Sequence, residues 1–328
     1  MVICLIISTI LILIFAFING FNDSCIVVAP LVSSRTTSIK IALLIASIGN
    51  FIGPLIFGTI VAKTIGEGLF NLGTFKIETI LFALIAAIAW NIITWYSGIP
   101  SSSSHTLIGA IIGASIIFNG FSSIKLTGLY KILIFLLLSP LIGFIIGSIV
   151  TKVTYFTLRN AKPKINNFLR ISQIPLSIVL SISHGANDSQ KTTALMAMVF
   201  LISGIFNTFK IPYWMLIANA FAISLGSLIG GKRVIKTVGE KMFNIKPINS
   251  FSALLTSSSI IIASTLLGGP VSSTHILSSS LVGSGASERI NKIRWSVIHK
   301  IIFVLFFTIP ITAAISMVFS YLYKLVKG

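Results

Sequence analysis

Two aspartates are the first residues of this chain that could do chemistry. Asp23 and Asp188 are its only aspartates, and both lie within long apolar runs. An ionised carboxylate at membrane depth costs at least ~2.5–3.5 kcal/mol, so it usually faces a water-filled cavity or a partner and marks an ion path. Each follows an asparagine, Asn22 or Asn187. Because carboxylate and amide oxygens suit hard cations, we expect these four residues to bind Na⁺, with both aspartates as metal ligands, or the aspartates to carry a proton.

A second repeated pattern is rich in hydroxyl groups. Residues 100–106 read Pro-Ser-Ser-Ser-Ser-His-Thr, and residues 270–275 read Pro-Val-Ser-Ser-Thr-His. Proline suits the first turn of a helix and serine is a good cap, so each copy predicts a chain break followed by a helix start. The free N–H groups of a helix start favour an oxyanion. The hydroxyl ligands predicted for the anion are Ser101, Ser102, Ser103, Ser104, Thr106, Ser272, Ser273 and Thr274.

The surroundings of these motifs add further candidates. Glycine and asparagine tolerate irregular backbone, so each Asn-Asp motif predicts a broken helix whose free carbonyls could ligate a cation. Lys191 shares a helix face with Asp188 if the helix continues. It could balance the charge of Asp188, contact the anion or extend towards an interface. We count Lys191, Asn22 and Asn187 among the substrate-binding candidates. His105 and His275 could donate to the anion, titrate or fix the backbone.

The elements that position these residues must be membrane helices. The chain has 328 residues, of which 55% are hydrophobic and only 9% charged, whereas soluble domains carry about 25% charged residues. Its apolar runs are long and do not alternate, which predicts an all-α, polytopic protein of the cell membrane. The net charge of +18 comes from basic residues that lie mostly between apolar segments. It therefore indicates topology and lipid contact, with no nucleic acid partner.

The segment count predicts the architecture. We expect ten apolar helices, at residues 2–32, 39–62, 77–97, 100–119, 128–156, 172–203, 211–231, 250–267, 270–286 and 296–323. Basic loops at 152–170, 232–246 and 289–300 are expected in the cytoplasm, with both termini outside. Each half has five segments, an odd number, so the halves should form inverted repeats with the site where they meet. The predicted units are an N-terminal repeat at 1–158, a basic cytoplasmic linker at 159–171 and a C-terminal repeat at 172–328, with re-entrant-type hairpins at the serine-rich tips.

These motifs resemble those of the inorganic phosphate transporter family, the PiT permeases. Residues 185–191 are similar to the family's second Gly-Ala-Asn-Asp motif, and residues 100–106 and 270–275 resemble its serine-rich segments. The resemblance implies an inverted-repeat helical fold, symport of phosphate with Na⁺ or H⁺, and often a homodimer. The first motif differs, because Phe21 replaces a small residue and Ile26 replaces a second asparagine that could ligate a cation.

The sequence thus predicts a secondary active symporter of inorganic phosphate, coupled to Na⁺ or H⁺ by alternating access and without a cofactor. A sulfate permease of the same fold and an anion channel remain alternatives. A carboxylate such as Asp23 could accept the proton that phosphate keeps at neutral pH, which favours phosphate over sulfate. An enzyme is not expected, since no Gly-x-Ser-x-Gly nucleophile elbow occurs.

Overall fold

The computed structural model describes residues 2–69, 75–230, 235 and 242–327, and all regular secondary structure in these ranges is helical. The basic loop predicted at 232–246 falls largely outside the described residues, including Lys232, Arg233, Lys236 and Lys241. Within the described ranges, seven helices are long and apolar enough to cross a membrane. The chain is therefore a multi-pass membrane protein.

The predicted segments correspond closely to the helices. The first half contains α1 (Val2–Ser33), α2 (Ile39–Phe57), α3 (Ile60–Gly68), α4 (Ile77–Tyr96), α5 (Ser103–Phe118), η2 (Phe121–Ser123) and α6 (Leu126–Thr157). The second half contains α7 (Ile165–Ile202), α8 (Tyr213–Ile229), α10 (Pro247–Leu266), α11 (Ser273–Glu288), η4 (Ile290–Lys292) and α12 (Trp295–Lys327).

Two boundaries differ from the sequence prediction. The segment predicted at 39–62 is broken, because Gly58 takes a φ of 69° that favours glycine and α3 starts anew at Ile60. The new helix start is supported from outside, since the Gln190 side-chain oxygen accepts hydrogen bonds from the backbone N–H groups of Val61 and Ala62 at 2.8 and 3.2 Å. Helix α7 begins at Ile165, so it includes the second half of the segment predicted as a linker.

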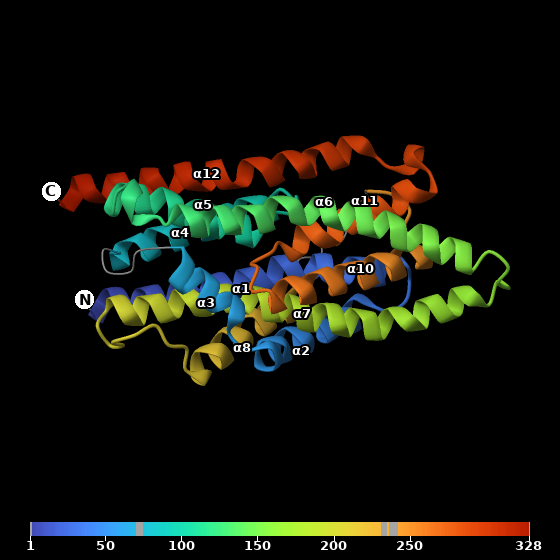
Figure 1. The fold of residues 1–328 in the computed structure, drawn as a ribbon, viewed down its shortest axis with the longest axis horizontal. Helices are drawn as coiled ribbons and strands as arrows, with labels where there is room; N and C mark the ends of the chain where they lie inside the picture. The colour runs from blue at the N-terminus through green and yellow to red at the C-terminus, as the bar shows by residue number, and fades with distance from the viewer. Residues whose placement is uncertain (1, 70–74, 231–234, 236–241, 328) are drawn as a thin grey trace.

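The helices lie roughly parallel to one long axis, and two hairpins enter from opposite ends (Figure 1). The α4–α5 hairpin occupies the left part of the view and the α10–α11 hairpin the right part, and their tips meet near the middle. There Ser104 Oγ of the first tip donates to the backbone oxygen of Val271 in the second tip at 3.1 Å. Both termini lie at the left end, while the α6–α7 loop lies at the right end.

The two halves pack crosswise. Helix α1 packs against α8 and α2 packs against α7, while α5 packs against α12 and α6 against α11. The first glycine of each Asn-Asp motif lies at such a crossing. A Cβ atom on Gly20 would lie 2.0 Å from the backbone oxygen of Ile223 in α8, and one on Gly185 would lie 2.4 Å from the Cα of Asn50 in α2. Only a residue without a side chain allows these backbones to approach so closely.

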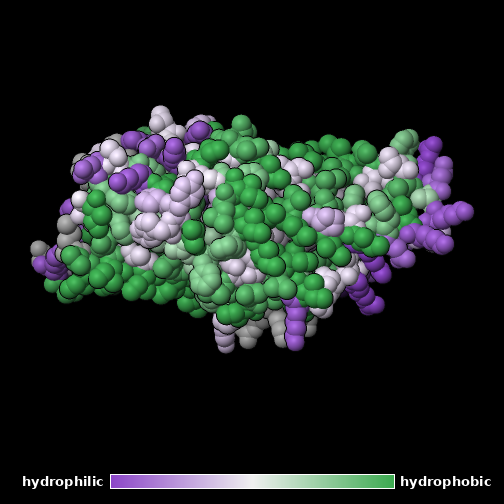
Figure 2. All heavy atoms as spheres, turned by 90° about the horizontal axis from the view of Figure 1, so that it is seen from below, coloured by the Kyte–Doolittle hydropathy of each residue, from purple (hydrophilic) through white to green (hydrophobic). Residues whose placement is uncertain are grey.

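This packing corrects one prediction. Helices α1 and α7 run unbroken through both Asn-Asp motifs, so no backbone carbonyl is freed there by a break. The glycines serve close helix packing instead of an irregular backbone. The outer surface is apolar in the middle and hydrophilic towards the ends, which suits a chain surrounded by lipid (Figure 2).

Candidate functional site

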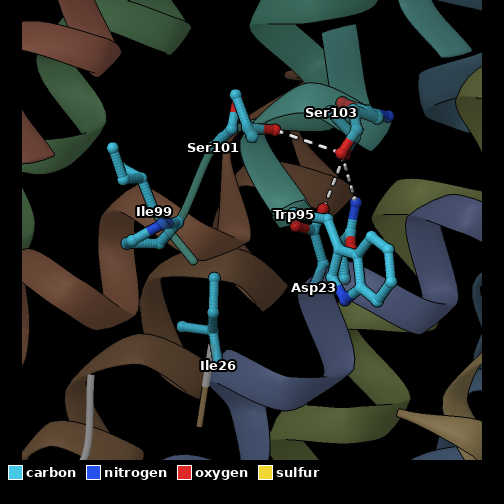
Figure 3. Close-up of a pocket in the computed structure, with 10 residues that line it drawn as sticks. Asp23, Ile26, Trp95, Ile99, Ser101 and Ser103 are labelled. Atoms are coloured by element: carbon cyan, nitrogen blue, oxygen red, sulfur yellow. Dashed lines mark hydrogen bonds between the residues drawn. The ribbon is translucent and has the colours of Figure 1, made fainter. Parts of the chain in front are cut away.

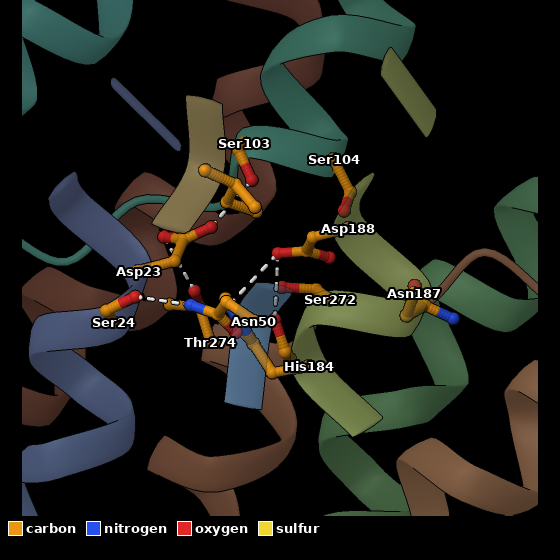
Figure 4. A network of polar contacts seen from close by, with 12 residues as sticks. Asp23, Ser24, Asn50, Ser103, Ser104, His184, Asn187, Asp188, Ser272 and Thr274 are labelled. Atoms are coloured by element: carbon orange, nitrogen blue, oxygen red, sulfur yellow. Dashed lines mark hydrogen bonds and ion pairs between the residues drawn. The ribbon is translucent and has the colours of Figure 1, made fainter. Parts of the chain in front are cut away.

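The carboxylate of Asp23 lies on α1 where the two hairpin tips meet, and the residue is only 2% exposed (Figure 4). Its Oδ2 accepts a hydrogen bond from Ser103 Oγ at 2.6 Å, and its Oδ1 accepts one from Thr274 Oγ1 at 2.9 Å. Ser103 belongs to the first tip and Thr274 to the second. Among the described residues, no lysine, arginine or histidine nitrogen lies within 4.0 Å of Asp23. Hydroxyl donors solvate this carboxylate but do not neutralise it.

Two basic side chains contact the carboxylate of Asp188 on α7. Lys191 Nζ lies 2.5 Å from its Oδ1, and His184 Nε2 lies 3.1 Å from its Oδ2. Ser273 Oγ also donates to Oδ2 at 3.2 Å. Lys191 is 3% exposed, so it does not extend to an interface, and the prediction that it shares a helix face with Asp188 is confirmed. The ion pair of Asp188 with Lys191 therefore neutralises a buried charge in the second half.

The two carboxylates lie close together. Ligand atoms of Asp23, His184 and Asp188 all lie within 4.8 Å of one another, and all three residues are buried. This limit on the distance between ligand atoms is about twice the distance of 2.3–2.6 Å between a hard cation such as Ca²⁺ and each oxygen ligand. The arrangement is therefore able to hold one small cation between the halves.

A hydrogen-bond chain that the sequence did not reveal positions His184. Asn50 Nδ2 donates to Ser24 Oγ at 2.9 Å and to Ser227 Oγ at 2.7 Å. Ser227 gives its own proton to the backbone oxygen of Ile223 at 2.7 Å, so it accepts from Asn50 and from Ser24. The amide oxygen of Asn50 must then face His184, whose Nδ1 lies 2.8 Å away.

It follows that His184 Nδ1 carries a proton and donates it to Asn50, which leaves Nε2 towards Asp188. His184 was visible in the sequence only as a histidine near the second motif. Asn50 gave no signal, because a single asparagine in an apolar run matches no repeated pattern. Figure 4 shows how α1, α2 and α7 bring these polar groups together.

Seven of the eight hydroxyls predicted to bind the anion divide into two groups, and the eighth, Ser101, lines the cavity described below. Ser103, Ser273 and Thr274 bond to the aspartates, as described above. Ser104 Oγ accepts a hydrogen bond from Lys191 Nζ at 2.5 Å and lies between the two tips. Lys191 donates further to the backbone oxygen of Val271 at 2.7 Å. These four hydroxyls and the ammonium group form one continuous polar cluster with both carboxylates.

The second group serves the local structure of the tips. Ser102 and Ser272 are the N-caps of α5 and α11, where they accept from the backbone N–H groups of His105 and His275 at 3.3 and 3.2 Å. Thr106 Oγ1 donates back to the backbone oxygen of Ser102 at 2.8 Å. The predicted helix starts are thus confirmed. The rings of His105 and His275 contact each other, with centroids 4.6 Å apart, and so join the two hairpins.

The two motif asparagines have different surroundings. Asn187 points away from the carboxylates in Figure 4 and is used by the second hairpin, donating to Thr265 Oγ1 and the backbone oxygen of Gly269, both at 3.1 Å. Its own oxygen accepts from the backbone N–H of Val271 at 3.2 Å. Asn22 Nδ2 donates to the backbone oxygen of Asn91 at 3.3 Å, while its buried Oδ1 has no hydrogen-bond partner.

A cavity opens on the Asp23 side (Figure 3). It is narrow, with about 10 Å³ of free space, and is lined by Asn22, Asp23, Ser101 and Ser103 together with apolar and aromatic side chains such as Trp95. Asp188 does not line it. The orphaned oxygen of Asn22, the carboxylate of Asp23 and the nearby hydroxyls form the oxygen-rich donor set that a hard cation takes.

Comparison with known proteins gives consistent results. The phosphate transporter family matches residues 19–167 and 157–316. The chain is 39% identical to a probable low-affinity inorganic phosphate transporter of Bacillus subtilis (strain 168), over 98% of this chain and 99% of the relative. It is 37% identical to a protein of the same description from Rhizobium meliloti (strain 1021), over 93% of this chain and 92% of that one.

A solved structure titled "The sodium-dependent phosphate transporter" has a TM-score of 0.86 with this chain, at 25% identity, over 98% of this chain and 99% of that chain. These relatives are named for phosphate, so the sulfate alternative gains no support, and they are named as transporters rather than enzymes. The resemblance read from the two Asn-Asp motifs and the serine-rich tips is therefore confirmed: the chain belongs to the phosphate transporter family.

Proposed function

We propose that this chain is a secondary active symporter that takes up inorganic phosphate together with Na⁺. The observation that carries the proposal is the pair of buried carboxylates, whose ligand atoms lie within 4.8 Å of each other. Within the described part of the chain, only Asp188 of the two has a lysine partner. Two like charges at this distance repel strongly in a low-dielectric interior. A cation beside Asp23 would relieve that repulsion. The similar solved structure is of a protein named as sodium-dependent, which supports Na⁺ as the cation.

The same charges explain why the anion would need a co-transported cation. The carboxylates of Asp23 and Asp188 and the ammonium group of Lys191 together carry one net negative charge. Phosphate would add more negative charge to a buried site, and an uncompensated buried charge is strongly unfavourable. A cation bound first would make phosphate binding favourable, and bound phosphate would in turn retain the cation. This mutual dependence is what couples the two fluxes.

The contacts suggest which candidates would touch each ion. Ser103, Ser104, Ser273 and Thr274 would turn their hydroxyls to phosphate, with Lys191 as the cationic donor. Ser101 would join them from the cavity. The capping hydroxyls of Ser102, Ser272 and Thr106 would act indirectly, by orienting the tips.

For the cation, Asp23 and the orphaned oxygen of Asn22 would supply ligands, and Asp188 would stand opposite. Asn187 would have to break its hydrogen bonds to the second hairpin before its side chain could bind the cation. H⁺ is the other candidate for the coupling ion. It is favoured by one contact: because His184 donates through Nδ1, a bound proton would let Nε2 and the Asp188 oxygen 3.1 Å away form a hydrogen bond.

We also infer that the two halves are inverted repeats. Exchanging α1 with α7, α2 with α8, α5 with α11 and α6 with α12 leaves the packing partners unchanged. The hairpins α4–α5 and α10–α11 enter from opposite ends, as such an exchange requires (Figure 1). Inverted repeats around a midplane site support alternating access, in which the two ends open in turn.

The test is uptake of labelled phosphate into proteoliposomes. With an imposed inward Na⁺ gradient and no pH gradient, we expect phosphate to accumulate above its external concentration. Accumulation driven only by a pH gradient would assign the coupling to H⁺. Phosphate that equilibrates without accumulating under either gradient would show a channel, and uptake of sulfate in place of phosphate would contradict the substrate.

A further inference from the structure

Helices α6 and α7 extend beyond a membrane at the right end of the molecule. They contain 32 and 38 residues, which correspond to lengths of about 48 and 57 Å, whereas the hydrocarbon core of a bilayer is only about 30 Å thick. Figure 1 shows their connecting loop projecting at that end, past most of the other helices. This projecting hairpin must therefore lie in the headgroup region of one leaflet.

The projecting hairpin is strongly basic. Between residues 152 and 170 the chain has five lysines and arginines and no acidic residue. Figure 2 shows hydrophilic side chains gathered at this right end. Clusters of this kind beside membrane helices attract anionic lipid, with about 1 kcal/mol for each lysine or arginine near the surface.

Large apolar side chains lie among these cations. Phe156, Phe168 and Ile171 are 66%, 61% and 68% exposed. Arg159 places its guanidinium 4.7 Å from the centroid of the Phe156 ring. A loop in water would not expose so many large apolar groups so close together. The mixture of apolar and basic side chains matches the boundary between acyl chains and phosphate groups.

A groove runs between this hairpin and the start of α10. It has a volume of about 500 Å³, and its apolar lining includes Leu158, Ile165 and Leu169. Arg170 from α7 and Lys246 from the start of α10 also line it. Because the groove joins an apolar wall to two cations from different helices, it is complementary to an amphiphile with a negative head.

The two cationic side chains differ in whether a nearby carboxylate neutralises them. Lys246 forms an ion pair with Glu288. Arg170 is exposed, and no carboxylate lies within 4.0 Å of it among the residues that the structure describes. Arginine also presents a planar set of donors that suits phosphate oxygens. Arg170 is thus the group in the groove with an unmet charge.

We propose that the groove between α6, α7 and α10 binds an anionic phospholipid, with the lipid phosphate on Arg170 and Lys246 and an acyl chain along Leu158, Ile165 and Leu169. The site lies at one end of the molecule, away from the carboxylate pair, and does not depend on which ion is transported. It would fix the position of the long α6–α7 hairpin in one leaflet.

The proposal is tested by native mass spectrometry of the purified full-length protein. The protein is incubated with equal amounts of phosphatidylglycerol and phosphatidylcholine that have the same acyl chains. We expect preferential retention of phosphatidylglycerol by the wild type. Arg170→Gln should lower this retention about five-fold, the equivalent of ~1 kcal/mol, and the double variant with Lys246→Gln should lower it further. Lys131→Gln is the matched control, because Lys131 is an exposed lysine of α6 near its opposite end.

Equal retention of the two lipids by the wild type would overturn the proposal without any variant, so a misfolded Arg170→Gln protein would not leave it open. Equal losses in Arg170→Gln and Lys131→Gln would overturn it as well. Two additions test other occupants. Displacement of the lipid by millimolar inorganic phosphate would identify a site for free anions instead. If the wild type is a dimer and Arg170→Gln is a monomer with unchanged lipid retention, the groove is an interface between copies of the chain.

Discussion

The two aspartate sites occupy matching positions in the two halves and differ in charge. Asp188 forms an ion pair with Lys191, three residues further along the same helix. The position three residues after Asp23 is Ile26, which is apolar and 1% exposed. Among the described residues, only the hydroxyls of Ser103 and Thr274 therefore donate to the Asp23 carboxylate. One half carries its own cation, and in the other half the proposed transported cation would take that place.

The hairpin contacts show the same difference. Thr274 of the second tip crosses to bond Asp23 directly. Its counterpart in the first tip, Ser104, crosses towards Asp188 but reaches Lys191, which stands between them. The lysine thus interrupts a pattern that is otherwise shared. The comparison teaches that a repeated framework can hold one permanent ion pair and one exchangeable site, and the following predictions test it.

The largest effect is expected from Asp188→Asn. Removing this carboxylate leaves the buried ammonium of Lys191 without a partner, which should lower the free energy of unfolding by ~3–5 kcal/mol and abolish transport. Thermal unfolding in detergent measures the loss. In the double variant with Lys191→Met most of the stability should return, because no buried charge remains unpaired. A double variant as unstable as Asp188→Asn would contradict the assignment of the ion pair.

Asp23→Asn should have the opposite profile. Among the described residues no lysine pairs with Asp23, and an amide can still accept from one of the two hydroxyls while its NH2 group donates to the other, so unfolding should change by only about 1 kcal/mol. Na⁺-driven phosphate uptake should fall at least about 100-fold, the equivalent of ~2.7 kcal/mol. Uptake in proteoliposomes and thermal unfolding, measured on the same preparation, separate the two effects. If Asp23→Asn is destabilised as much as Asp188→Asn, the two sites do not differ as described.

The motif glycines should behave alike in both halves. Gly20→Ala and Gly185→Ala each insert a methyl group against backbone of the other half, at 2.0 and 2.4 Å, and should each cost ~1–3 kcal/mol of unfolding free energy. Gly68→Ala is the control, because nothing lies within 4 Å of a Cβ atom there. Similar losses of unfolding free energy in Gly20→Ala and Gly185→Ala, with none in Gly68→Ala, would show that the two halves share their helix packing although they differ in charge.

The smallest effects are expected at the helix caps. Ser102→Ala and Ser272→Ala each remove the side chain that accepts from the backbone N–H of His105 or His275, which is typically worth about 1 kcal/mol. We expect modest losses of stability, larger for Ser102→Ala because Ser102 Oγ also lies 2.9 Å from the His105 ring Nδ1, and phosphate uptake that is reduced but still driven by Na⁺. A loss of uptake as large as that of Asp23→Asn, with unfolding unchanged, would place these hydroxyls on the ions instead.

The sequence predicted the outlines well because its strongest signals are local. Apolar length located the helices, and a proline followed by serines located both caps. Repetition identified Asp23, Asp188 and the hydroxyls that meet them. The role of Gly20 and Gly185 was misread, because a glycine in a membrane helix fits either an irregular backbone or a close crossing, and only the neighbouring helix decides. Asn50 was missed because its function depends on Ser227, which is 177 residues away.

The unbroken course of α1 and α7 limits how a cation could be coordinated. In a continuous helix the backbone oxygens are occupied by hydrogen bonds within the helix, except where a proline lacks the N–H donor, as Pro30 does for the backbone oxygen of Ile26 in α1. Most ligands near Asp23 must therefore come from side chains, and few are in reach. A hard cation with so small a coordination shell keeps open positions, which phosphate oxygens are able to fill. The substrate would then be part of the cation's own coordination sphere, so that neither ion is held fully until the other arrives.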